Sequence, residues 1–150
     1  MNARHEIVYF TDRDLGHRFP DKLKAAGIKV ERHDSHFEQM TTDPEWIGEI
    51  GRRGWVALTR DARIRYSPLA LETLMNSGAR LLVIVGRMTT DEAAELFIRH
   101  RFKIEIFLKK ETKPFIGKIR RDGILMWKRW RDWNRRAKSK ARAAGSMRRA

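Results

Sequence analysis

Six acidic side chains in this chain of 150 residues follow predicted strands or open a predicted helix, so they could form one site. Carboxylates that come close together repel one another, and a bound cation removes that cost. Hard oxygen ligands of this kind suit Mg²⁺ or Mn²⁺. Because the chain has no cysteine, a thiolate zinc site is excluded. The six candidates are Asp12, Asp14, Asp34, Asp43, Glu45 and Asp61.

Four short segments must position these carboxylates, and each has the composition of a buried strand. Apolar, β-branched and aromatic residues dominate them, and helix signals separate one from the next. This alternation predicts an α/β/α sandwich of three layers around a central, mainly parallel sheet. Ligands bind beyond the carboxyl ends of the strands in such sheets, where Asp12, Asp14 and Asp61 would lie. The predicted strands are residues 6–11, 28–33, 55–59 and 80–86.

Caps and apolar spacing predict the helices. One helix begins near Asp43, because cap-type residues and a proline come before an apolar face. It brings Asp43 and Glu45 to the edge of the other carboxylates if the preceding loop crosses over the sheet. A capping box from Thr89 to Glu92 begins a helix that we expect to continue unbroken to residue 110.

The C-terminal part of the chain differs in composition from the rest. Residues 118–150 contain 13 Lys and Arg but 2 Asp and Glu, a net charge of +11 out of +14 for the whole chain. Such an excess favours a polyanionic partner, most simply nucleic acid. Asp122 and Gly123 stand between two apolar-containing runs, a pattern typical of a β-hairpin. We expect a hairpin and a Trp-rich basic segment over residues 113–134, and a flexible basic tail over 135–150.

Three tryptophans recur at a spacing of three in the basic segment, at Trp127, Trp130 and Trp133. On a helix they would share roughly one face, where they could stack on bases while arginines meet phosphates. We favour packing on the domain or on a partner, because three exposed tryptophans would form an apolar patch.

Each carboxylate taken alone has a simpler interpretation. Asp is common after strands and at helix starts because it caps and turns the chain. The metal interpretation therefore depends on several acids at matching strand ends. His33 and His36 flank Asp34 in "RHDSHF", but two imidazoles suit zinc or nickel better than magnesium. We interpret this stretch as a loop beside the substrate.

Three stretches together resemble a known family. They are "FTDRDLGHRFPDKLKAAGIKVERHD", "DPEWIGEIGRRGWVALTRD" and "LLVIVG". They are similar to the PIN-like domains related to VapC-type ribonuclease toxins, over residues 6–110. The resemblance implies a metal-dependent nuclease domain, which we place at residues 1–112.

The resemblance also implies roles for single residues. Asp12 matches the first metal aspartate of the family, and Asp61 matches the aspartate after the third strand. Asp43 matches the acidic residue that opens the helix, with Glu45 as a close competitor. Thr59 matches the hydroxyl residue that orients the acidic cluster.

The chain departs from the commonest pattern of the family directly after Asp61, where residues 62–64 include no second acid. This departure puts full occupancy of a second metal site in doubt. Asp14 or Glu45 could hold an outer-sphere water or support proton transfer. Guanidinium groups pair bidentately with phosphate. The predicted phosphate contacts are Arg60, Arg63 and Arg65.

The function that follows is hydrolysis of RNA phosphodiester bonds by a cytoplasmic endoribonuclease with Mg²⁺ or Mn²⁺, as the toxin of a toxin–antitoxin pair. The expected partners are RNA, an antitoxin protein and, as a further candidate, a second copy of the chain. We expect no membrane association, since no segment approaches the roughly 20 apolar residues that cross a bilayer.

Two other classes of function compete with this one. A receiver-type signalling domain also places acids after its first and third strands, but it needs a lysine after a later strand, and "VIVGRM" has none. A catalytically inactive nucleic-acid-binding module would depend on the basic tail instead. Metal-dependent cleavage of RNA separates the nuclease from this module.

Overall fold

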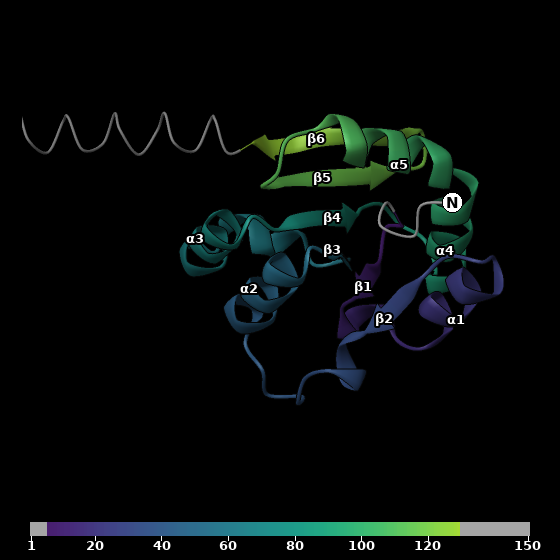
Figure 1. Ribbon diagram of the computed structural model, residues 1–150. Helices are drawn as coiled ribbons and strands as arrows, with labels where there is room; N and C mark the ends of the chain where they lie inside the picture. The colour runs from purple at the N-terminus through teal and green to yellow at the C-terminus, as the bar shows by residue number, and fades with distance from the viewer. Residues whose placement is uncertain (1–5, 130–150) are drawn as a thin grey trace, which may run out of the picture.

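The computed structural model describes residues 6–129 of the chain. Six strands form one sheet in the order β2-β1-β3-β4-β5-β6 (Figure 1). Neighbouring strands are parallel except β5 and β6, which are antiparallel. The strands are β1 (Tyr9–Thr11), β2 (Val30–Arg32), β3 (Val56–Thr59), β4 (Arg80–Ile84), β5 (Phe115–Arg120) and β6 (Gly123–Arg129).

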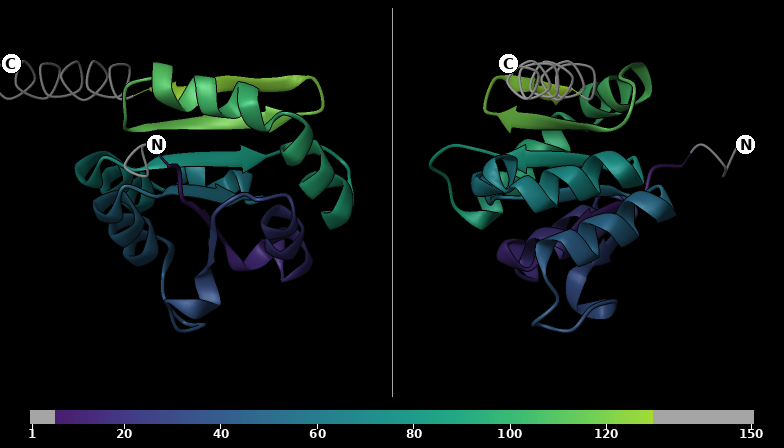
Figure 2. Two further views of the ribbon diagram at one scale, coloured as in Figure 1. Left: turned by 45° about the vertical axis from the view of Figure 1, so that its right-hand side comes forward. Right: turned by 90° about the vertical axis from the view of Figure 1, so that its left-hand side faces the viewer.

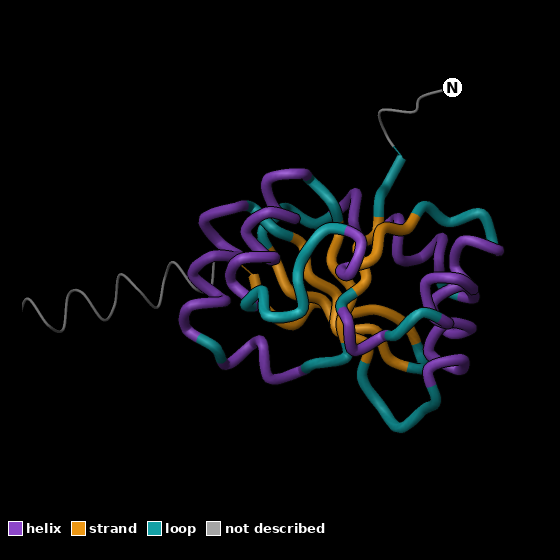
Figure 3. Tube along the Cα trace, turned by 90° about the horizontal axis from the view of Figure 1, so that it is seen from below, coloured by secondary structure: helices purple, strands orange, loops and turns teal. Residues whose placement is uncertain are grey.

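Helices cover both faces of this sheet, so the strands form the middle layer (Figure 3). On one face, α2 and α3 pack over a core that includes Trp46, Ile50 and Leu74. On the other face, α1, α4 and α5 pack over a core that includes Phe19 and Phe97. The predicted three-layer fold with a mainly parallel sheet is confirmed. The helices are α1 (Arg18–Ala25), α2 (Asp43–Arg53), α3 (Pro68–Ser77), α4 (Thr90–Arg99) and α5 (Arg101–Lys110).

The prediction of one unbroken helix from Thr89 to residue 110 is wrong. The chain leaves helical geometry at His100, where φ is −99° and ψ is 10°. After this bend α5 lies along the β5–β6 hairpin (Figure 2). There the rings of Phe107 and Phe115 meet edge to face, 5.5 Å between centroids. The bend thus covers strands that a straight helix would pass by.

The predicted hairpin is present, with Arg121 and Asp122 between its strands. Trp127 lies in β6, as the second run of the predicted hairpin indicates, and not on the helix that was considered for the three tryptophans. Trp130, Trp133 and the basic tail lie outside the described residues. Because β5 pairs with β4, the hairpin extends the main sheet. The domain boundary at residue 112 stays a prediction.

The start of α2 is held by a capping box, which fixes the position of the acids in its first turn. The Thr42 hydroxyl accepts from the Glu45 amide at 3.4 Å, and the Glu45 carboxylate accepts from the Thr42 amide at 3.1 Å. Farther along, α2 packs closely on α3 at Gly51. A Cβ at Gly51 would lie 2.3 Å from the Oγ of Ser77.

Candidate active site

The candidate site lies where the order of the strands changes direction. From β1 the chain passes to β2 on one side, and then crosses to β3 on the other side of β1. Ligands of doubly wound sheets bind outside the carboxyl ends of the strands at such a switch point. Asp12 follows β1 there, and its amide donates to the Leu58 carbonyl of β3 at 3.0 Å. The ends of β1 and β3 are therefore joined at the site.

The hydroxyl of Thr59, the last residue of β3, brings two of the predicted carboxylates together. Its Oγ1 lies 2.8 Å from Asp12 Oδ2 and 3.0 Å from Asp14 Oδ2, and it accepts from the Asp61 amide at 3.1 Å. Thr59 is completely buried. Because a hydroxyl has one hydrogen to donate, two carboxylates compete for it. The site is therefore short of donors in the metal-free protein.

The surroundings of Asp12 and Asp14 change the acidity of both carboxyl groups. Burial, with the charge of Asp14 next, raises the pKa of Asp12 to about 6. Burial also raises the pKa of Asp14, against a hydrogen bond from the Arg60 amide at 3.0 Å. Raised values mean that the ionised forms are unfavourable where they stand. A divalent cation beside these oxygens would remove that penalty, so the pair fits such an ion in charge and in donor type.

Asp61 lies beside the pair but is already neutralised by an arginine. Its oxygens accept from the Arg63 Nε at 3.0 Å and from the Arg63 Nη2 at 3.3 Å. These hydrogen bonds lower the pKa of Asp61. The side chain of Arg63 is 89% exposed, so it can swing into solvent and free the carboxylate. That movement would make both oxygens of Asp61 available to a metal ion.

The two acids of α2 have different surroundings. The negative charge of Asp43 contributes to the raised pKa of Asp12, so the two carboxylates lie near each other. Asp43 also accepts from the indole Nε1 of Trp46 at 3.0 Å. Glu45 is used by the capping box. Within residues 6–129, no three His, Asp or Glu side chains stand close enough to hold a metal ion without rearrangement.

Two of the three arginines predicted to contact phosphate are engaged elsewhere. Arg60 donates from Nη1 to the Met88 carbonyl at 3.0 Å and from Nη2 to the Gly86 carbonyl at 2.7 Å. The guanidinium of Arg65 lies 3.9 Å from the ring centroid of Trp127. Arg63 alone combines an exposed side chain with a place at the carboxylates. The roles of all three toward phosphate stay predictions.

Asp34, the sixth acidic candidate, is paired with basic groups. Its oxygens lie 3.1 Å from the Nε of Arg32 and 3.2 Å from the Nε2 of His17. Arg32 and Arg13, which the sequence did not single out, lie beside Asp12. No motif or spacing marked these two arginines, since Arg13 follows β1, Arg32 ends β2, and folding brings the two segments together.

Comparisons with known proteins point to one family. Residues 7–86 match the family described as "PIN like domain". Over 80 residues the chain is 31% identical to a curated protein of Mycobacterium tuberculosis named "Putative ribonuclease VapC45". That match spans 50% of this chain and 58% of the relative. No solved structure matches the chain significantly. No helix within the described residues has the length and apolar character to cross a membrane.

Proposed function

Because the chain belongs to the PIN-like domain family, we propose that it is a metal-dependent endoribonuclease. One observation carries the proposal: the carboxylates of Asp12 and Asp14 converge on the buried hydroxyl of Thr59 at the switch point of the sheet. The name of the M. tuberculosis relative supports RNA as the substrate. The family match also speaks against the receiver-type alternative.

Asp12, Asp14 and Asp61 would hold the cation, with Asp43 as a fourth ligand. When bound, Mg²⁺ or Mn²⁺ would acidify a water and stabilise charge on the phosphoryl oxygens. Thr59 would keep the carboxylate oxygens in place, since second-shell hydrogen bonds orient ligands.

Other residues of the chain would handle the substrate and the proton. Arg63, once released from Asp61, would pair with a phosphate oxygen, because its planar donors match that group. Of the two acids expected to support proton transfer, Asp14 would be used by the cation, which leaves Glu45 once its carboxylate has left the capping box. An antitoxin that covers the site and a cytoplasmic location belong to the same proposal.

The test is cleavage of a mixed-sequence single-stranded RNA by the purified protein. We expect cleavage with Mg²⁺ or Mn²⁺, none in EDTA, and recovery when the metal is restored. Asp12→Asn should abolish cleavage. Asp21→Asn is the matched control, because Asp21 is exposed on α1 and outside the carboxylate group, so it should cleave as the parent does. RNA binding without cleavage under all these conditions would favour the inactive binding module.

A further inference from the structure

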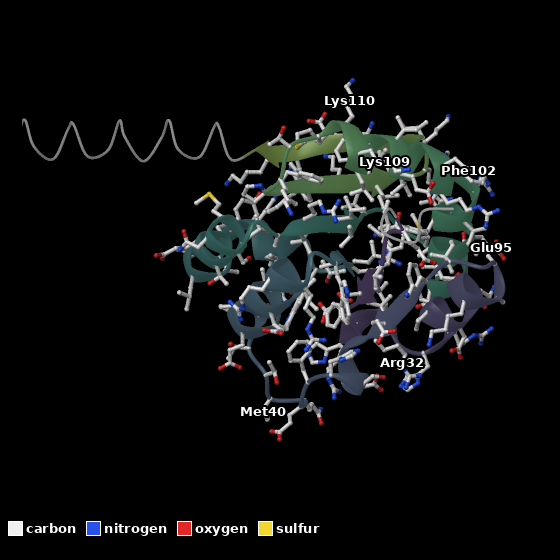
Figure 4. The ribbon with its side chains drawn as sticks, viewed as in Figure 1. Arg32, Met40, Glu95, Phe102, Lys109 and Lys110 are labelled. Atoms are coloured by element: carbon white, nitrogen blue, oxygen red, sulfur yellow. The ribbon has the colours of Figure 1, made fainter. Side chains whose placement is uncertain are left out.

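A small hollow adjoins the carboxylates at the ends of β1 and β2. Its volume is about 60 Å³, and its wall includes Asp12, Arg13, Gly16 and Arg32. Figure 4 labels Arg32 in this part of the molecule. Pockets for whole small molecules measure roughly 300–1,000 Å³. The hollow therefore suits a group of a few heavy atoms, such as one phosphate, and is too small for a nucleoside.

Arg13, on one part of the wall, is positioned by a buried imidazole. Its Nε lies 3.2 Å from the Nδ1 of His33. His33 is 3% exposed, and its ring lies among the aromatic rings of Phe10, Phe37 and Trp46. Burial, and next the charge of Arg13, lowers the pKa of His33. A neutral imidazole can accept the arginine hydrogen, because guanidinium only donates.

Arg32 is held in a similar way by His17 and Asp34. Its Nη1 lies 2.9 Å from His17 Nδ1, and its Nε lies 3.1 Å from Asp34 Oδ1. The other ring nitrogen of His17 faces Asp34 Oδ2 at 3.2 Å. His17 therefore accepts from the arginine and donates to the carboxylate. These two side chains fix the guanidinium of Arg32 at the wall of the hollow.

Both guanidinium groups have N–H donors that no group of the described protein accepts. A guanidinium carries five N–H donors. Among residues 6–129, the terminal nitrogens of Arg13 and the Nη2 of Arg32 have no hydrogen-bond or ion-pair partner. Two fixed cations with unused donors beside a phosphate-sized hollow are the chemistry that recognises an oxyanion.

We propose that this hollow receives a phosphate of the RNA strand adjacent to the scissile one, bound by Arg13 and Arg32. The proposal rests on the ribonuclease function proposed above. Phosphate contacts set the register of a strand without reading its sequence. The hollow would thus place the scissile bond over Asp12 and Asp14. It would bind the phosphate of any nucleotide, without a preference for its base.

The first experiment measures binding without cleavage. Affinity for a labelled single-stranded RNA is followed by fluorescence anisotropy in EDTA at several salt concentrations. Each phosphate contact contributes about 0.7 to the log–log salt slope on single strands. Because Arg13 and Arg32 would share one phosphate, the Arg13→Gln, Arg32→Gln double variant should reduce the slope by about 0.7, and each single variant by part of that amount. Arg52→Gln is the control, since it also removes an ion-paired arginine, but at the far end of α2.

The second experiment uses inorganic phosphate and amide chemical shifts. Phosphate should shift the amides of Arg13, Gly16 and Arg32 in the parent protein, and the double variant should lose these shifts. Should Arg32→Gln fail to fold, Arg13→Gln still tests the site, because Arg13 is exposed.

The outcomes separate this inference from the proposed function. An unchanged salt slope and no phosphate shifts in a protein that cleaves RNA would overturn the subsite and leave the ribonuclease intact. Phosphate binding lost in the double variant of a protein that cleaves no RNA would refute the ribonuclease and leave an anion site. Equal slopes for the double variant and Arg52→Gln would also overturn the subsite.

Discussion

Replacing Asp12 by Asn should stabilise the metal-free protein at neutral and alkaline pH. The pKa of Asp12 is about 6 in the fold against 3.8 for an ordinary aspartate. At about 1.4 kcal/mol for each pH unit, this difference of about two units costs about 3 kcal/mol when the group is ionised. Asn keeps an oxygen for the Arg13 amide, which donates to Asp12 at 2.7 Å, and is itself a good cap.

The sign of the pH dependence follows from the raised pKa. Below about pH 4 the Asp12 carboxyl is protonated in both states, and its penalty is absent. Between about pH 4 and 6 the unfolded chain loses the proton first, so the free energy of unfolding falls as pH rises. Above pH 6 the Asp12 carboxyl group is ionised in the folded state too, and the free energy of unfolding falls no further on its account. The advantage of Asn should therefore appear between pH 4 and 6 and stay constant above.

The assay is urea denaturation of parent and variant in EDTA at pH 4, 6 and 8. We expect the variant to gain about 1–3 kcal/mol at pH 8, since local relaxation reduces the full value, and little at pH 4. Asp61→Asn is the control with the opposite sign, because Arg63 lowers the pKa of Asp61. If Asp12→Asn is less stable than the parent at pH 8, the electrostatic reasoning is refuted.

Three further predictions concern other parts of the molecule. Thr59→Val keeps the shape of the side chain but removes its hydrogen bonds to Asp12 and Asp14, so Mn²⁺ affinity measured by calorimetry should fall about 10–100-fold. Deletion of residues 135–150 should flatten the salt dependence of RNA binding without changing the cleavage products seen on sequencing gels. Gly51→Ala should cost about 1–3 kcal/mol in thermal or urea unfolding, because its Cβ would lie 2.9 Å from the Ser77 carbonyl oxygen.

Parent-like results would contradict each of the three. Metal affinity unchanged in Thr59→Val would make Thr59 only a strand residue. An unchanged salt slope after the deletion would mean that the tail does not touch nucleic acid. If Gly51→Ala unfolds like the parent, α2 and α3 can move apart without a loss of stability. Gly16→Ala cannot replace this test of packing, because Gly16 has a φ of 64°, where alanine would add backbone strain.

The sequence predicts the sheet well because strand composition and helix caps are local signals. The buried strands and the capping box formed by Thr89 and Glu92 can be recognised from neighbouring residues alone. The break at His100 could not be predicted, because neither Gly nor Pro marks it and α5 bends to cover a hairpin distant in the chain. The strand position of Trp127 agrees with the hairpin signal at Asp122 and Gly123, and pairing with β5 extends β6 through it.

The placement of Asp12 and Asp14 at one edge followed from the rule that parallel strands end there, whereas the role of Thr59 came from the family resemblance. The hydrogen-bond and ion-pair partners of the charged groups could not be predicted in this way, because they depend on how side chains from distant segments of the chain meet. Spacing alone could not show that Arg63 closes on Asp61, or that Arg60 reaches the carbonyls after β4. Charge composition likewise directed attention to the tail, although two arginines beside Asp12 have donors to spare.

The most direct test of metal-assisted hydrolysis is the chemistry of the product ends. An RNA with one 2′-deoxy nucleotide at the mapped cleavage position is incubated with the protein and Mn²⁺, and the fragments are weighed by mass spectrometry. If a water held at Asp12, Asp14 and Asp61 is the attacking group, the deoxy substrate is cleaved and no fragment carries a 2′,3′-cyclic phosphate. Loss of cleavage at the deoxy position, or cyclic phosphate ends on ordinary RNA, would show that the 2′-hydroxyl attacks and would contradict the account.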